Sequence, residues 1–150
     1  MKKIALLVIF LLSINCSGAL AATPEIKAPC RLEVDNAHIS KNILKFEARS
    51  AVKIVFRSIC NVSQEKLVMK VQILKTGWLG SLPAGPLFQR NFHFVAANQI
   101  VELKNIYLIC KNTKRTTYYG IATASAFVGG KKVYANKVES KLKISLLCGT

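Results

Sequence analysis

Residues 44–60 read LKFEARSAVKIVFRSIC and carry the clearest periodic pattern in the chain. The even-numbered positions are apolar or small, among them Phe46, Val52 and Phe56, whereas the odd-numbered positions hold every charged residue. Alternation with a period of two places one face of a strand in a core and the other face in water. A helix would leave Phe46 among the charges. We therefore predict one long strand over 44–60, with a bend near Ser50 because 17 residues is long for a strand.

Other segments repeat this alternation or have the composition of strands. Residues 116–128 are rich in Thr, Tyr, Phe and Val, and Gly129-Gly130 follows them, which predicts a hairpin to the last strand. Residues 77–86 contain three glycines and two prolines and are predicted to form a loop. The remaining predicted strands cover residues 31–34, 67–73, 88–95, 100–109 and 137–146.

These segments together predict an all-β protein of about seven or eight strands with no helix after residue 21. The predicted architecture is an antiparallel β-sandwich of the immunoglobulin-like type. A small closed barrel is the alternative. Because Trp78 falls in a loop and the cysteines fall at strand ends, the likeness to immunoglobulin domains is one of architecture only.

The N-terminus has the features of a cleavable export signal. Lys2 and Lys3 precede an apolar run over 4–14, and Ala19-Leu20-Ala21 supplies a small-x-small cleavage site. We predict a signal peptide over 1–21, a single domain over 22–150 and a secreted or periplasmic location. The apolar run is short for a membrane anchor, which needs about 20 residues, and no transmembrane segment is predicted in 22–150. Lipidation of Cys16 is a minor alternative, since the residues before it depart from the usual lipoprotein pattern.

Removal of Cys16 with the signal would leave four cysteines, which in an exported chain indicates two disulfides. A zinc site is disfavoured because there is no C-x-x-C pair. A hairpin turn centred on Gly129 places Cys148 opposite Cys110, and a turn shifted by half a residue places it opposite the neighbouring Lys111. Both registers predict a Cys110–Cys148 bridge, and Cys30–Cys60 follows by elimination.

Loss of Lys2 and Lys3 would leave 20 basic and 7 acidic residues, a formal charge of +13. Such a charge attracts anionic polymers, including those of a cell surface. The outward positions of the predicted strands would form a cationic plate if those strands share one sheet. The alternative is that these charges keep an exported sheet soluble and protect its edges. The basic residues of the predicted plate are Lys45, Arg49, Lys53, Arg57, Lys66, Lys70, Lys137, Lys141 and Lys143.

No catalytic motif or cofactor-binding motif is present, and no cofactor or metal is predicted. His38 and His93 with a lysine would suit a ribonuclease-like hydrolase of polyanions, but both are expected on solvent-facing positions. The segment with Trp78, Leu79 and nearby leucines is a candidate contact for a protein partner; the alternative is that Trp78 caps the core. We therefore expect a non-enzymatic exported binding protein, with a secreted hydrolase or a secreted inhibitor or effector as alternatives.

Overall fold

The computed structural model describes residues 29–150, so the predicted signal peptide and the predicted start of the domain at residue 22 lie outside the described residues. Strands make up 70% of the described part and helix 6%, which confirms the predicted all-β class. In chain order the elements are β1 (Cys30–Val34), β2 (His38–Ile39), α1 (Lys41–Glu47), β3 (Ala51–Cys60), β4 (Gln64–Gly77), β5 (Gly80–Pro83), β6 (Phe88–Val95), β7 (Ile100–Ile109), β8 (Asn112–Val128), β9 (Lys131–Glu139) and β10 (Ile144–Gly149).

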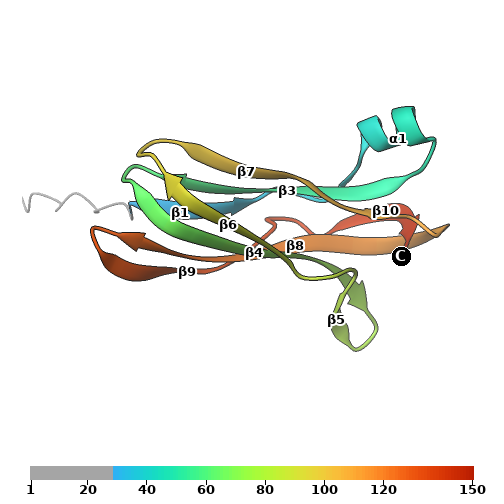
Figure 1. Cartoon of the computed structure of the whole chain (residues 1–150). Coiled ribbons are helices and arrows are strands. Elements are labelled where there is room, and N and C mark those ends of the chain that lie inside the picture. Colours follow the sequence, from blue (N-terminus) through green and yellow to red (C-terminus); the bar gives the residue numbers. More distant parts are fainter. Residues whose placement is uncertain (1–28) are drawn as a thin grey trace, which may run out of the picture.

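The strands form two antiparallel sheets, which lie as two layers in Figure 1. In the first, sheet A, β3 is central and pairs with β7 on one side and with β1 and β2 on the other. In the second, sheet B, β4 and β8 are central and pair with each other. β5 and β6 extend sheet B beyond β4, and β9 and β10 extend it beyond β8.

One hydrophobic core lies between the two sheets. Ile54 and Phe56 of sheet A and Met69 and Tyr118 of sheet B are fully buried in the same cluster. Gly120 of β8 lets the sheets approach, because a Cβ atom there would lie 2.7 Å from Val34 Cγ1 and 2.9 Å from Phe56 Cε1. The two inner faces thus interlock through alternating positions of their strands.

The first part of the predicted strand over 44–60 is wrong: it lies in the short helix α1. Ser40 caps this helix, since its Oγ accepts a hydrogen bond from the backbone N–H of Ile43, and Ala48 ends it with a φ of 53°. Phe46 is 77% exposed as a result. From Ala51 onward the predicted alternation is confirmed, with the even-numbered positions of β3 buried.

Two further segments differ from their predicted form. The predicted strand over 137–146 is divided between β9 and β10 at Ser140, whose Oγ accepts from Gly120 N–H at 2.8 Å and donates to the Asp35 carbonyl at 2.7 Å. The predicted loop over 77–86 is in part a hairpin, in which β4 continues to Gly77 and β5 returns beside it. These divisions, with the separate short strand β2, give ten strands where seven or eight were predicted.

Both predicted disulfides are confirmed. Cys30 and Cys60 are directly opposed in β1 and β3 of sheet A, with 4.1 Å between their Cα atoms. Cys110 follows β7 of sheet A and is bonded to Cys148 of β10 in sheet B, with 4.9 Å between their Cα atoms. The hairpin turn has the register shifted by half a residue, and later bulges shift it further. The pairing holds because Cys110 lies in the connection between β7 and β8, beside the end of β10.

Candidate binding surface

The hairpin of β4 and β5 projects from sheet B and ends in two large apolar residues (Figure 1). Trp78 is 89% exposed and Leu79 is 86% exposed at this turn. The interpretation that Trp78 caps the core is therefore wrong. Two-residue hairpin turns usually carry Asn, Asp or Gly. The conformation of the turn therefore does not explain why Trp and Leu occupy these positions. We call the segment from Gly77 to Pro83 the hairpin.

The hairpin is held against the outer face of sheet B. Tyr119 lies on the opposite face of β8 from the core residue Tyr118, yet only 4% of its surface is exposed. Its hydroxyl donates a hydrogen bond to Ser81 Oγ of β5 at 2.5 Å. Gly80 adopts a φ of 119°, a conformation that glycine tolerates best, directly after the turn. The apolar tip is thus mounted on a paired and anchored support.

The same outer face carries five lysines that lie close to aromatic rings or beside other outward residues. Lys143 Nζ lies 4.7 Å from the centre of the Tyr119 ring, so it shares this ring with the hairpin. Lys70 alternates with the buried residues Met69 and Val71 of β4 and therefore points outward. Two more lysines lie over rings, Lys66 over Phe127 at 5.7 Å and Lys132 over Tyr134 at 5.3 Å.

The fifth lysine, Lys137, forms the one ion pair found on this face in residues 29–150, with Glu139 at 2.9 Å. The hydrogen bond to Glu139 raises the pKa of Lys137 above its ordinary value. Glu65 is the other carboxylate on the outer side, since it pairs in register with the outward residue Phe127. Five lysines against two glutamates leave the face cationic. We call these lysines, with the rings beneath them, the lysine face: Lys66, Lys70, Lys132, Lys137 and Lys143.

The condition for a single cationic plate is not met, because the strands that carry its residues belong to different sheets. Lys53 and Arg57 belong to β3 of sheet A, whereas Lys70 and Lys137 belong to sheet B. Lys66 is also on β4 of sheet B. The other predicted members lie outside the strands: Lys45 on α1, Arg49 between α1 and β3, and Lys141 and Lys143 between β9 and β10.

On the outer face of sheet A, Arg57 and Lys104 are paired with carboxylates of the same face. Arg57 donates to Asp35 Oδ1 and to Glu102 Oε1, both at 2.6 Å, and these hydrogen bonds raise its pKa. Lys104 Nζ lies 2.7 Å from Glu102 Oε2. The pKa of Glu102 lies below its ordinary value; the hydrogen bond with Lys104 is the largest cause, and the hydrogen bond with Arg57 is the next largest. Within residues 29–150, Lys53 of β3 forms none of the ion pairs found, whereas Arg57 and Lys104 are both paired.

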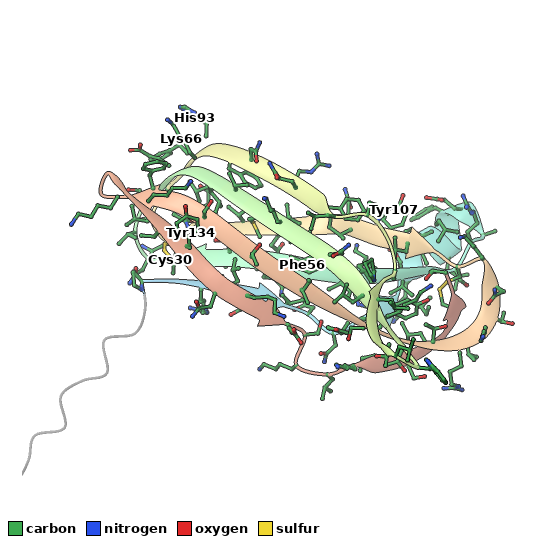
Figure 2. The ribbon with its side chains drawn as sticks, turned by 90° about the horizontal axis from the view of Figure 1, so that it is seen from below. Cys30, Phe56, Lys66, His93, Tyr107 and Tyr134 are labelled. Atoms are coloured by element: carbon green, nitrogen blue, oxygen red, sulfur yellow. A yellow bond between two sulfur atoms is a disulfide. The ribbon has the colours of Figure 1, made fainter. Side chains whose placement is uncertain are left out.

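The two histidines lie on different sheets, His38 on β2 and His93 on β6, and both are exposed. Figure 2 shows His93 at the edge of the molecule near Lys66. Of the two phenylalanines that flank His93, Phe92 packs against the core and Phe94 is 60% exposed. The physical reason is Lys66, whose φ of 48° interrupts the alternation of β4 opposite this part of β6.

Two cavities lie away from the hairpin, between β1 and β9. One, of about 240 Å³, has a mainly apolar lining with Leu67 and Val133, and the buried Gln64 Oε1 lacks a hydrogen-bond partner there. The second, of about 350 Å³, is lined by Asp35 and Glu139 among others. Neither histidine lines either cavity. Within residues 29–150 no three His, Cys, Asp or Glu side chains are grouped to hold a metal, and no helix is long and apolar enough to cross a bilayer.

The sequence identified Trp78 and several of these lysines but not their relation to aromatic rings. In the structure, Tyr119, Phe127 and Tyr134 lie beneath Lys143, Lys66 and Lys132, respectively. The available signal was the odd-numbered positions of β8, which include both Tyr119 and Phe127. That signal becomes interpretable only when the inward face of β8 is known.

No known protein family matches this sequence, and no curated protein matches it as a relative. The geometry of the hairpin and the lysine face is therefore the basis for the functional argument.

Proposed function

We propose that this protein is an exported, non-enzymatic binding protein that attaches to an anionic cell surface through the hairpin and the lysine face. The observation that carries the proposal is the exposure of Trp78 and Leu79 at an anchored turn. Large apolar side chains at an exposed loop on a rigid support are typical of interaction sites. The lysine face, which reaches the hairpin at Lys143, supplies the attraction to negative charge.

The proposal also includes the finer architecture and the route of export. Two antiparallel sheets that share one core support an immunoglobulin-like β-sandwich. Two disulfides are typical of proteins that fold in an oxidising compartment. N-terminal sequencing of the protein released by expressing cells should begin at Ala22; a product that retains residues 1–21 would contradict the signal peptide.

The test measures retention of the labelled, disulfide-bonded protein on intact cells of its source. The protein is expressed from the full sequence, and the double variant Trp78→Ser, Leu79→Ser is compared with wild type. We expect retention to fall at least about tenfold, because each of these side chains would lose an apolar contact.

Phe46→Ser is the matched control, since Phe46 is equally apolar and 77% exposed but lies on α1. This control should keep wild-type retention. Equal retention of the hairpin double variant and wild type would exclude the hairpin as the attachment site.

A secreted inhibitor or effector is the second candidate, favoured by the same projecting hairpin. A protein cleft would accept the hairpin without using the lysine face. In that case the double variant Lys70→Glu, Lys143→Glu would keep its binding, whereas attachment to an anionic surface requires those lysines.

A further inference from the structure

We infer that the anionic surface is a lipid bilayer, into whose headgroup region the hairpin inserts Trp78 and Leu79 while the lysine face contacts the headgroups. This inference rests on the proposed function and names its partner. Its observations are the apolar character of the tip, the position of Lys143 beside it, and the burial of Tyr119 and, in part, Phe127 under lysines of this face.

The tip is apolar over more than its turn. Leu82 of β5, which lies next to Gly77 at the turn, is 50% exposed. Nucleic acids and acidic polysaccharides are bound by stacking rings, hydrogen bonds and cations, and exposed leucines offer none of these. An indole and adjacent leucines match the boundary between headgroups and acyl chains, where one end of the indole meets water and its rings meet hydrocarbon.

The tip and the lysines lie on the same side of sheet B. Tyr119 establishes this, because its hydroxyl contacts Ser81 of the hairpin while Lys143 lies over its ring. Figure 1 shows the hairpin projecting beyond sheet B on the side away from sheet A. A bilayer that receives the tip would therefore face the lysine side chains as well. Lysines near a membrane surface attract anionic lipids without demanding one headgroup geometry.

The rings on this face are poorly placed to bind nucleic acid. Tyr119 is 4% exposed, and Phe127 is half-buried and lies under Lys66. A base-stacking platform needs several accessible rings in a row, whereas Tyr134 is the single well-exposed ring of the three. The rings instead hold the lysines outward by cation–π contacts.

The test uses vesicles of equal parts phosphatidylglycerol and phosphatidylcholine, with vesicles of phosphatidylcholine alone for comparison. The full sequence is expressed and the disulfide-bonded protein is purified. Trp78 is the only tryptophan of the chain, so its emission reports on the hairpin tip directly. We expect the emission to shift to shorter wavelength with anionic vesicles, and lipids brominated on their acyl chains to quench it.

Co-sedimentation with the vesicles then compares variants. We expect the variant Trp78→Ser, Leu79→Ser to bind at least about tenfold more weakly, and the variant Lys70→Glu, Lys143→Glu to lose a similar factor. Phe46→Ser and Lys41→Glu on α1 are the matched controls and should bind as wild type does. Urea midpoints equal to wild type would show that the exposed substitutions leave folding intact.

Vesicle binding that is unchanged in the hairpin variant would overturn the inference, and so would equal binding to neutral vesicles. Binding to a single-stranded oligonucleotide but not to anionic vesicles would replace it with a nucleic-acid partner. If vesicles are not bound but retention on cells still depends on Trp78, the inference fails and the proposed function stands. If both vesicle binding and cell retention are independent of the hairpin, both fail.

Discussion

The outer faces of the two sheets use their charges in opposite ways. On sheet A, Arg57 lies between Asp35 and Glu102, and Lys104 completes the network. On sheet B, Lys66, Lys132 and Lys143 lie over aromatic rings, and Lys137 is the one lysine of this face that is paired with a carboxylate in residues 29–150. A cation that is already hydrogen-bonded within the protein contributes to its stability, whereas one without a carboxylate remains available to a partner. Under the proposed function, sheet A would therefore serve stability and sheet B recognition.

The Cys110–Cys148 bridge joins the end of β7 in sheet A to β10 in sheet B. We expect its removal to lower the free energy of unfolding more than any other change considered. The bridged residues are 38 apart in sequence, for which the chain-entropy relation gives about 4 kcal/mol. We expect Cys110→Ser, Cys148→Ser to lose about this much free energy of unfolding, measured by urea denaturation. Cys30→Ser, Cys60→Ser removes a bridge within sheet A over a similar separation and serves as the comparison. A loss below about 1 kcal/mol would contradict a linking role for the first bridge.

The close approach of the two sheets at Gly120 is the next target. Gly120→Ala would place a methyl group against Val34 and Phe56, and either sheet would have to move. We expect a loss of about 1–3 kcal/mol in the free energy of unfolding, as for other overpacked cores. Thr123→Ala, at an exposed position on the same strand, is the control and should change stability little. An unchanged urea midpoint for Gly120→Ala would show that the sheets are not tightly packed there.

A smaller effect is expected where the hairpin meets sheet B. Tyr119→Phe removes the hydrogen bond to Ser81 but keeps the ring beneath Lys143. We expect a loss of about 1 kcal/mol in the free energy of unfolding and weaker binding of anionic vesicles, because the tip loses its support. Tyr134→Phe, on the same face but without a hydrogen bond to the hairpin, should keep wild-type binding. If Tyr119→Phe binds vesicles as wild type does, the backbone pairing of β4 and β5 is sufficient to position the tip.

The sequence predicts the fold best where alternation is uninterrupted, as over β3 and the middle of β4. The prediction fails over α1, where Ser40 caps the start and Ala48 the end of a helix although the apolar residues alternate as in a strand. It also fails at Ser140, which follows β9 and donates a hydrogen bond to the distant Asp35 carbonyl. The candidate surface was predictable only in part. Trp78 is conspicuous in the sequence, but its relation to Lys143 requires Tyr119, which is distant from the hairpin along the chain.

The smallest expected effect concerns pH and tests sheet A directly. Lys104 and Arg57 lower the pKa of Glu102, so the folded state favours the ionised carboxylate more than the unfolded chain does. The stability from this carboxylate is complete above the ordinary pKa of about 4.5 and is lost as the pH falls through the lowered value. Glu102→Gln should therefore be less stable than wild type at pH 7, and its urea midpoint should fall less between pH 5 and pH 3.

The matched control for this prediction is Lys41→Met, which removes an exposed lysine of α1 that forms none of the ion pairs found in residues 29–150. It should follow the wild-type pH profile, and vesicle binding should be unchanged in both variants because neither residue faces sheet B. The effect is small because Lys104 is 66% exposed and water screens the pair. If Glu102→Gln instead altered vesicle binding while its pH profile matched wild type, the assignment of sheet A to stability and sheet B to recognition would have to be reversed at this position.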